Sequence, residues 1–437
     1  MKHVVFIGAD FAPSSLPPAL RIRFFARHLP EFGWQPTILS THPRHYGWPV
    51  DPQNEQLLPA DLSVIRTPAL PERLTRKIGI GDIGMRSMPF HWRAFAGLQR
   101  RRPVDLVCIP VPPYMPMVLG RLIAMRYRIP YMIDYIDPWV TDYYWKLPPA
   151  ERPPKWPLAN ALARICEPFA LRRVGHISGV SRGTTDSVVA RYDWLDQRDA
   201  SEIPYGGEPG DFDYLRAHLR ANPVFDKSDG CLHISYVGAC IPAMYATVRA
   251  VFAAIRYGLE AAPDCFAKLR LHFVGTSYTA GADGDRPIEG LAHEAGIGRY
   301  VSEHPAREPY LTALQILLDS HGLVVVGSDE PHYTASKIFP YILARRPLLA
   351  IFHEASSVVS ILRETRAGEI VTFNPQEPPA AKVPQILTAL QHMLNLPAAA
   401  EPDTCWPAFA PYTTRAMAER LAGAFEQAVQ HGARQEL

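Results

Sequence analysis

The chain has 437 residues, more than a single hydrophobic core usually fills, and this length predicts two domains of roughly 200 residues each. Hydrophobic residues make up 47% of the chain and charged residues 20%, shares that are typical of a globular protein and exclude a disordered one. The net charge of +2 provides no general attraction for nucleic acid, so none is expected as a partner.

The sequence also indicates no zinc site, no secretion signal and no membrane-spanning helix. The six cysteines include no C-x-x-C pair, which indicates reduced thiols and no zinc site. The first eight residues contain an apolar run, but the run is short, Asp10 follows it and no cleavage pattern is present, so we expect a β-strand rather than a secretion signal. No stretch of the sequence comes near the length of about 20 apolar residues that a membrane-spanning helix needs. We expect a cytoplasmic protein, either soluble or peripheral on the inner face of the membrane.

The first half of the chain alternates between apolar runs of strand length and amphipathic runs of helix length. The strand-like runs are continuously apolar, as expected when helices cover both faces of a parallel sheet. In chain order we expect a strand at residues 4–7, a helix at 18–32, strands at 36–40 and 106–109, a helix at 115–127 and a strand at 131–136. This pattern predicts a doubly wound α/β domain.

A second series of the same kind begins near residue 232. In chain order we expect a strand at residues 232–237, a helix at 243–258, strands at 269–274 and 301–304, a helix at 309–320, and strands at 323–326 and 348–352. A last helix, at 413–430, has an apolar face that must pack on something. The second half therefore also predicts a doubly wound domain.

Glycine and proline cluster at residues 203–209, which indicates a linker. The expected domains are residues 1–205, residues 206–410, and a terminal helix, 411–437, that packs back on the first domain. The predicted fold class is α/β, with two Rossmann-like parallel-sheet domains facing across a cleft.

The segment from Gly327 to Ile351, which connects two expected strands, is the most informative in the chain. Thr334 is expected to cap a helix, which would place Lys337 in the first helical turn, where the helix dipole disfavours a cation. A bound anion would reverse this penalty, because free backbone N–H groups and a lysine together make an anion site. The segment indicates a phosphate-bearing ligand; the alternative is a solvated lysine at a frayed helix end.

Three expected strands are followed directly by a glycine, at Gly8, Gly238 and Gly275. Glycine lets a ligand approach the backbone closely, although a tight strand-to-helix turn explains each one equally well. Their recurrence favours ligand binding at the carboxyl ends of the strands, where doubly wound domains bind ligands.

Several short motifs, in their order and spacing, carry a family resemblance. They are Arg21 or Arg23 followed by Glu31-Phe32-Gly33-Trp34, Asp134-Tyr135-Ile136-Asp137-Pro138-Trp139, Ile177-Ser178-Gly179-Val180-Ser181, Ile203-Pro204-Tyr205-Gly206-Gly207, Tyr236-Val237-Gly238, Phe273-Val274-Gly275 and Ser336-Lys337-Ile338-Phe339-Pro340-Tyr341. With these motifs the chain resembles the GT-B glycosyltransferases, especially their retaining family 4-like branch.

The resemblance implies a nucleotide-sugar donor in the C-terminal domain and an acceptor in the N-terminal one, with no cofactor and no metal. It implies that Ser336, Lys337 and the turn at Gly238 hold the diphosphate and that backbone groups near His304 read the base. The donor contacts that we expect are Gly238, Gly275, His304, Glu330, His332, Ser336 and Lys337.

Two departures from the family put the donor in doubt. The members of a Glu-x7-Glu pair fall on His332 and Pro340, and a proline cannot bind the ribose hydroxyls. Pro340 would also kink the helix unless the helix starts later than expected. The basic residue that commonly follows the glycine matching Gly238 is missing as well, so Glu330 or His332 would have to compensate. The donor is unusual, or the activity is reduced or lost.

Asp137 is the expected catalytic residue. It follows a strand, and a carboxylate there would orient an acceptor hydroxyl or stabilise an oxocarbenium-like transition state; the alternative is a turn-capping aspartate. Asp10, Ser14 and Ser15 in the loop after the first strand, and Arg21 in the next helix, are the expected acceptor contacts; the alternative for Arg21 is a solvated helix arginine.

Residues 73–102 carry eight basic residues and a single acidic one, interleaved with apolar side chains. Such a segment favours docking on an anionic membrane surface, where each basic residue contributes about 1 kcal/mol. The alternative is a basic loop followed by an ordinary amphipathic helix packed on its domain.

The expected function is transfer of a sugar from a nucleotide-sugar to a glycan or lipid-linked acceptor, with retention, in surface polysaccharide biosynthesis. One alternative is a nucleotide-sugar 2-epimerase, whose acid/base residues we cannot place in the sequence. The other is a non-catalytic GT-B protein that binds a glycan or a partner, which Pro340 favours.

Overall fold

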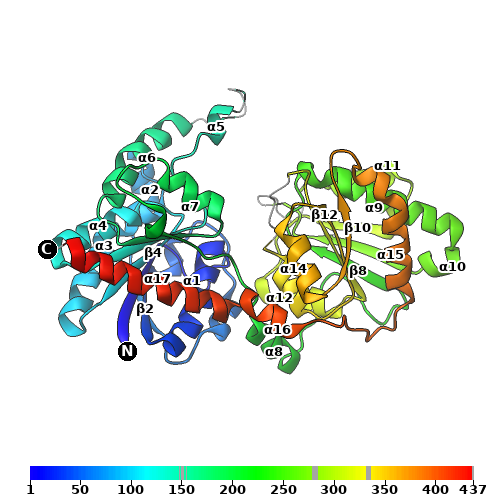
Figure 1. The fold of residues 1–437 in the computed structure, drawn as a ribbon, viewed down its shortest axis with the longest axis horizontal. Coiled ribbons are helices and arrows are strands. Elements are labelled where there is room, and N and C mark those ends of the chain that lie inside the picture. Colours follow the sequence, from blue (N-terminus) through cyan, green and yellow to red (C-terminus); the bar gives the residue numbers. More distant parts are fainter. Residues whose placement is uncertain (147, 149–151, 154, 278–283, 331–335, 436–437) are drawn as a thin grey trace. The chain divides into compact units, whose positions relative to one another are not determined.

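A computed structural model of the protein describes residues 1–146, 148, 152–153, 155–277, 284–330 and 336–435 (Figure 1). The chain divides into two compact units: unit 1, formed by Met1–Gly206 with Thr414–Leu437, and unit 2, formed by Gly207–Thr413. The division after Gly206 lies within the expected linker, and the last helix belongs to unit 1. Each unit contains one parallel sheet with helices on both faces.

Unit 1 contains a seven-stranded parallel sheet in the order β3-β2-β1-β4-β5-β6-β7. Its strands are β1 (Lys2–Gly8), β2 (Trp34–Thr41), β3 (Ser63–Thr67), β4 (Leu106–Val111), β5 (Tyr131–Tyr135), β6 (His176–Gly179) and β7 (Ala200–Glu202). Its helices are α1 (Pro17–His28), α2 (Glu72–Thr75), α3 (Ile83–Arg101), α4 (Pro116–Tyr127), α5 (Tyr143–Lys146), α6 (Trp156–Leu171), α7 (Arg182–Val189) and α17 (Thr414–Gln435).

The central strand β1 shows why the strands of unit 1 are apolar throughout. Val5 and Ile7 pack in a core with side chains of α3, α4 and α6, whereas Val4 and Phe6 pack in a second core with α1 and α17. Because successive strand residues face opposite sides of a sheet, a strand covered on both sides must be apolar at every position.

Helix α17 packs beside α1 on one face of the sheet of unit 1 (Figure 1). The ring centroid of Phe425 lies 5.0 Å from that of Trp34, which begins β2. Gly175, which precedes β6, allows α17 to approach the sheet closely, since a Cβ built at Gly175 would lie 2.7 Å from the carbonyl oxygen of Ala428. The apolar face of the last expected helix is therefore buried in the core of unit 1.

Unit 2 contains a six-stranded parallel sheet in the order β10-β9-β8-β11-β12-β13. Its strands are β8 (Leu232–Val237), β9 (Leu269–Val274), β10 (Val301–His304), β11 (Gly322–Val326), β12 (Leu348–His353) and β13 (Glu369–Phe373). Its helices are α8 (Pro209–Ala217), α9 (Tyr245–Ala261), α10 (Pro263–Phe266), α11 (Pro287–Glu294), α12 (Tyr310–Asp319), α13 (Ile338–Leu343), α14 (Ser357–Thr365), α15 (Val383–Asn395) and α16 (Trp406–Phe409).

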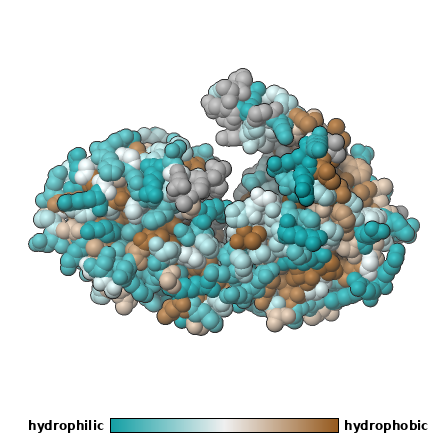
Figure 2. Space-filling view, turned by 180° about the vertical axis from the view of Figure 1, so that it is seen from behind, coloured by the Kyte–Doolittle hydropathy of each residue, from teal (hydrophilic) through white to brown (hydrophobic). Residues whose placement is uncertain are grey.

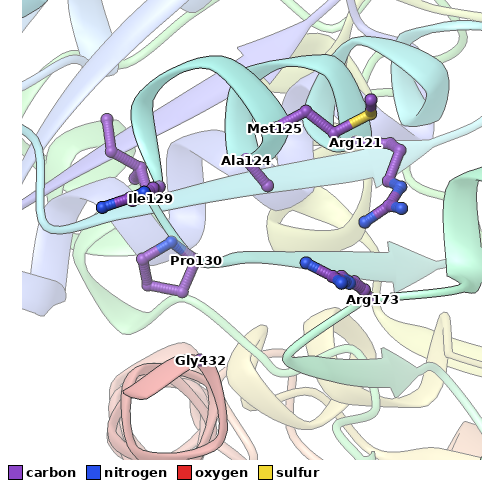
Figure 3. Close-up of a pocket in the computed structure, with 8 residues that line it drawn as sticks. Arg121, Ala124, Met125, Ile129, Pro130, Arg173 and Gly432 are labelled. Atoms are coloured by element: carbon purple, nitrogen blue, oxygen red, sulfur yellow. The ribbon is translucent and has the colours of Figure 1, made fainter. Parts of the chain in front are cut away.

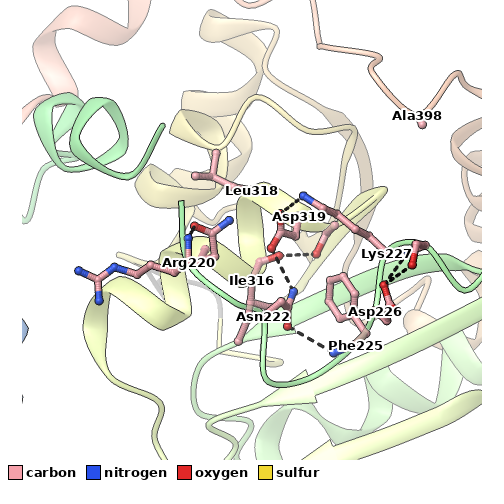
Figure 4. A network of polar contacts seen from close by, with 12 residues as sticks. Arg220, Asn222, Phe225, Asp226, Lys227, Ile316, Leu318, Asp319 and Ala398 are labelled. Carbon is pink, nitrogen blue, oxygen red and sulfur yellow. Dashed lines mark hydrogen bonds and ion pairs between the residues drawn. The ribbon is translucent and has the colours of Figure 1, made fainter. Parts of the chain in front are cut away.

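A polar network fixes the segment that leads into β8 (Figure 4). The Asn222 side-chain oxygen accepts hydrogen bonds from the backbone N–H groups of Val224, at 2.9 Å, and Phe225, at 3.3 Å. Asp319, at the end of α12, accepts hydrogen bonds from Asn222 and from the Lys227 ammonium, the latter at 2.8 Å. These bonds anchor the connecting segment to α12 and so set where β8 begins.

None of the helices in the described ranges has an apolar stretch of the length that crossing a membrane requires. The six cysteines are unpaired, and Cys108 and Cys240 are buried. The thiols therefore contribute to packing rather than to covalent cross-links.

Candidate functional site

In each sheet the strand order reverses direction at one point. In unit 2 the reversal lies between β8 and β11, and in unit 1 it lies between β1 and β4. The chain leaves the carboxyl ends of these neighbouring strands in opposite directions, and this is where open α/β sheets bind ligands. Gly238 and Lys337 follow the two strands in unit 2, and Asp10 follows β1 in unit 1.

Lys337 reaches from the segment after β11 to the turn after β8. Its ammonium donates hydrogen bonds to the Tyr236 hydroxyl at 2.6 Å and to the carbonyl oxygen of Ala239 at 3.0 Å, and lies 4.4 Å from the centroid of the Tyr236 ring. Gly238 has a φ of +136°, and a Cβ built there would lie 3.0 Å from the ammonium nitrogen. The turn therefore requires glycine both for its backbone conformation and for the approach of the lysine.

The charge of Lys337 has no counter-charge among the described residues, since both hydrogen-bond partners of its ammonium are neutral. Desolvation lowers the pKa of Lys337 to about 8. An anion placed beside this ammonium would favour its charged form and so raise the pKa again. A lysine held in this way provides an anion-binding position.

The helix after this segment starts later than expected. Thr334, the expected cap, and His332 lie outside the described residues, and α13 begins at Ile338, so Lys337 stands at the capping position rather than inside the first turn. Pro340 then lies in the first turn of α13, where a backbone N–H has no partner within the helix, so the proline does not break it.

The other expected donor contacts in unit 2 lie along the same edge of the sheet. Gly275 follows β9 with a φ of +70°, and its N–H donates to the carbonyl oxygen of His304, at the end of β10, at 2.8 Å. Partial burial lowers the pKa of His304, which favours its neutral form. Ser336 and Glu330 are both exposed, Ser336 directly before Lys337. Strand adjacency therefore gathers residues that are far apart in the sequence.

Unit 1 contains a cavity of about 460 Å³ at the carboxyl end of its sheet. Loops that follow β1, β2, β4 and β5 form part of its wall, together with the amino-terminal ends of α1 and α3. The polar and aromatic residues among those that line it are Asp10, Trp48, Glu72, Arg76, Asp82, Arg86 and Asp137. The cavity therefore combines several carboxylates with an indole ring, a combination suited to a polyhydroxylated ligand.

Asp10 is the buried carboxylate of this cavity, with 1% of its surface exposed. Its carboxylate accepts a 2.6 Å hydrogen bond from Ser14, whose own oxygen accepts one from the Trp48 indole at 3.2 Å. Burial raises the pKa of Asp10 to about 6, and the hydrogen bond from Ser14 opposes this only in part. Asp10 is in no ion pair among the described residues, so no opposite charge offsets its burial.

Asp137, the expected catalytic residue, lines the same cavity after β5. Although it is exposed, partial desolvation raises the pKa of its carboxyl group. Ser14 belongs to the site through its hydrogen bond to Asp10. Ser15 is half-buried and is not among the residues that line the cavity. The structure thus brings Asp10, Ser14 and Asp137 together.

The expectation that Arg21 contacts an acceptor is wrong. Arg21 is 1% exposed, and its guanidinium donates two hydrogen bonds to Asp134, at 2.6 and 2.9 Å. It also donates to the carbonyl oxygens of Ile203, at 2.7 Å, and Pro204, at 3.2 Å. These four bonds involve all three nitrogens and join α1 and β5 to the end of the first segment of unit 1, so Arg21 is a buried structural residue.

We expect Arg21→Met to lower the free energy of unfolding by about 3–5 kcal/mol, because it leaves Asp134 as a buried, unpaired charge. Chemical denaturation measures this loss. The matched control is Arg93→Met, which removes an exposed arginine of the same unit and should change stability by less than about 0.5 kcal/mol. Equal stabilities of the two variants would show that the buried pair does not hold unit 1 together.

The reasoning from sequence missed Trp48, Tyr236 and the charged residues Glu72, Arg76, Asp82 and Arg86 that line the cavity of unit 1. Trp48 stacks on Tyr46, with ring centroids 5.1 Å apart, and reaches Ser14 in the cavity of unit 1. The aromatic pair around Gly47, soon after an expected strand, was the available signal. Tyr236 lies in a motif that had been noted, but its contact with Lys337 depends on strands that are not adjacent in the sequence.

Comparison with known proteins gives a family and a fold. Residues 18–206 match the family model of the glycosyl transferase 4-like domain, and no curated protein matches the sequence. A glycosyltransferase from Rickettsia africae ESF-5 is similar in structure at 11% identity, covering 98% of this chain and 99% of that one, with a TM-score of 0.55.

Two further solved structures align with this chain over almost the full length of both proteins. A UDP-forming α,α-trehalose-phosphate synthase from Burkholderia xenovorans is 13% identical, covering 98% of this chain and 99% of that one, with a TM-score of 0.58. Anabaena Alr3699/HepE, solved in complex with UDP, is 12% identical, covering 100% of this chain and 98% of that one, with a TM-score of 0.52. At these identities the similarity is one of fold.

The protein has the GT-B fold, with two parallel doubly wound sheets of seven and six strands. The match to the model of the glycosyl transferase 4-like domain, residues 18–206, spans nearly all of the first segment of unit 1. The expected GT-B fold is therefore confirmed, and the match over residues 18–206 agrees with the expected family 4-like assignment, while the retaining branch stays a prediction.

Proposed function

We propose that the protein is a glycosyltransferase in which unit 2 binds a nucleotide-sugar donor and unit 1 binds a glycan or lipid-linked acceptor. The observation that carries the proposal is the Lys337 ammonium, which lies beside the Gly238 turn at the reversal point of the sheet without a counter-charge among the described residues. The diphosphate of a nucleotide-sugar supplies the missing negative charge.

The remaining donor contacts in this proposal are Gly275, His304, Glu330, His332 and Ser336, and the catalytic carboxylate is Asp137. Lys337 stabilises the diphosphate leaving group, the charge-stabilising role that a metal ion has elsewhere, so transfer is independent of metal. The proposal includes retention of configuration, a cytoplasmic location and a role in surface polysaccharide biosynthesis.

A thermal-shift panel of nucleoside diphosphates and their sugar conjugates tests the proposal, because a ligand that binds only the folded state raises the melting temperature. We expect at least one nucleotide to stabilise the protein, with and without a chelator. If no nucleotide in the panel stabilises it, the proposed donor site is wrong.

A second candidate function is a non-catalytic GT-B protein, which Pro340 favours. The structure places this proline within α13, where it offers neither a carboxylate nor a backbone N–H to a ribose. Nucleotide binding without sugar transfer or donor hydrolysis would support this alternative.

A further inference from the structure

A second cavity of unit 1, also of about 460 Å³, lies at the amino end of β5, opposite the first cavity at the carboxyl ends of the strands (Figure 3). It adjoins Pro130, which precedes β5, whereas the cavity with Asp137 follows that strand. No acidic residue is among those that line it: Arg121, Ala124, Met125, Arg128, Ile129, Pro130, Arg173 and Gly432. Arg121 and Arg173 point toward the same space in Figure 3. The cavity is therefore strongly basic.

The arginines of this cavity have no anionic partner in the part of the chain that the structure describes. The Nε and Nη1 atoms of Arg121 are buried and have no hydrogen-bond partner there, and its guanidinium lies 6.0 Å from the centroid of the Phe169 ring. Arg128 has a φ of +57°, a left-handed conformation that non-glycine residues seldom adopt. Buried hydrogen-bond donors without acceptors destabilise the folded protein, so a bound anion would be stabilised by the arginines of this cavity.

An exposed apolar face adjoins the cavity. On α4, Met125 lines the cavity and is 61% exposed. On the neighbouring helix α6, Leu158 is 72%, Ile165 70% and Phe169 41% exposed, and their spacing of seven and four residues places them along one side of the helix. Phe169 connects the two features, since it also contacts Arg121. The basic cavity and the apolar face therefore form one surface, which we call the α4–α6 surface.

The charges of the α4–α6 surface are almost all positive. Residues 116–128 and 156–173 contain six arginines and a single acidic residue, Glu167. Glu167 is fully buried and paired with Arg191 at 3.1 Å, so it does not offset the arginines at the surface. Arg164 is paired with the exposed Asp142 at 3.2 Å, which leaves five arginines to give the surface its positive charge. In the space-filling view, hydrophobic residues on unit 1 gather in patches among hydrophilic ones (Figure 2).

We propose that the α4–α6 surface docks on an anionic lipid bilayer, with a lipid phosphate in the arginine cavity and the apolar side chains at the level of the acyl chains. Apolar side chains rimmed by arginines fit the boundary between headgroups and hydrocarbon. This surface differs from residues 73–102, where the apolar side chains Ile83, Phe95 and Leu98 are buried in unit 1. The helix in that segment is thus an amphipathic helix packed on its domain.

Co-sedimentation of the full chain with vesicles of phosphatidylcholine, with and without phosphatidylglycerol, tests this proposal. We expect binding to the anionic vesicles that weakens at high salt, because salt screens the arginines. Arg128→Gln/Arg173→Gln removes two exposed charges and should weaken binding about 30-fold, if each contributes as basic residues near an anionic surface do. Leu158→Ser/Ile165→Ser should also weaken binding, since it removes the apolar contact.

The matched control is Arg100→Gln/Arg101→Gln, which removes two exposed arginines from α3 in residues 73–102 and should leave vesicle binding within about twofold. An equal loss in this control, or no vesicle binding at all, overturns the proposal. So does stabilisation by inorganic phosphate that depends on Arg128 and Arg173 without vesicle binding, which would indicate a site for a small anion. The proposal is independent of the donor site, and nucleotide binding should be unchanged in every variant.

Discussion

Replacing Lys337 by methionine is expected to abolish nucleoside diphosphate binding and, at pH 7, to leave the fold as stable as before or more stable. Methionine fills a similar space without a charge, so the anion loses its partner. The Tyr236 hydroxyl keeps its 2.7 Å hydrogen bond to the carbonyl oxygen of Ala239, so no new unsatisfied hydroxyl is created. Thermal shift with the nucleotides of the panel measures the first effect, and denaturation in urea the second.

The expected gain in stability follows from the pKa of Lys337. Its value of about 8 in the folded protein is below its usual value of 10.5, so the folded state loses the proton first. Stability therefore rises as the pH increases from about 8 to about 10.5, and below this window the buried charge costs up to about 3 kcal/mol, less where solvent reaches it. The methionine variant should lack this pH dependence.

The control for this variant is Lys268→Met, which removes an exposed lysine of the same unit. It should affect neither nucleotide binding nor the pH dependence of stability. If Lys337→Met bound nucleotide with parental affinity, the anion site would lie elsewhere in unit 2.

Replacing Asp10 by asparagine is expected to reduce sugar transfer about a hundredfold or more while nucleotide binding in unit 2 is retained. The carboxylate of Asp10 lies in the unit 1 cavity and is available to accept a hydrogen bond from an acceptor hydroxyl. Asparagine preserves the shape and the hydrogen bond from Ser14 but not the charge. Transfer assays with the donor that the panel identifies, combined with thermal shift, separate the two effects.

The pH dependence gives a second measurement for Asp10. Its pKa of about 6 is above the usual value of 3.8, so the folded state keeps the proton longer, and stability falls by up to about 3 kcal/mol as the pH rises through this window. Asp10→Asn should therefore stabilise the protein at pH 7 but not at pH 4. Transfer by the parent should decline below about pH 6, as Asp10 takes up its proton.

The control for Asp10→Asn is Asp61→Asn, which changes an exposed aspartate of unit 1 and should alter neither transfer nor stability. The other carboxylates of the cavity, Glu72, Asp82 and Asp137, remain in the variant and contribute to any residual pH dependence. Full activity of Asp10→Asn would exclude this carboxylate from acceptor binding.

The two variants share a physical basis. At the reversal point of each sheet lies one desolvated charge that pairs with no opposite charge among the described residues: the buried Asp10 in unit 1 and the half-buried Lys337 in unit 2. Such groups lower the stability of the folded state and are retained where a ligand makes use of them. We therefore expect both substitutions to reduce function and to increase stability at pH 7.

The sequence by itself determined the fold class and the type of the elements that it predicted, because the signals for strands and helices are local. Two expected strands have the bounds that β8 (Leu232–Val237) and β9 (Leu269–Val274) show. The linker and the packing of the last helix could also be predicted, since composition and one-sided apolarity are properties of short segments. Four strands were missed: β3, β7 and β13 at sheet edges, and β6 beside the edge strand β7. Each has only three to five residues, too few for a clear local signal.

Only the tertiary structure decided which polar residues meet. The sequence alone suggested that Arg21 and Lys337 would both bind ligands, yet Arg21 is paired with Asp134 whereas the ammonium of Lys337 contacts neutral groups. Nothing near either residue distinguishes them, because their partners lie about a hundred residues away and are brought close by neighbouring parallel strands. Burial and the presence or absence of a counter-charge decide whether a cation holds the fold together or is left for a ligand, and both are set by contacts between distant segments.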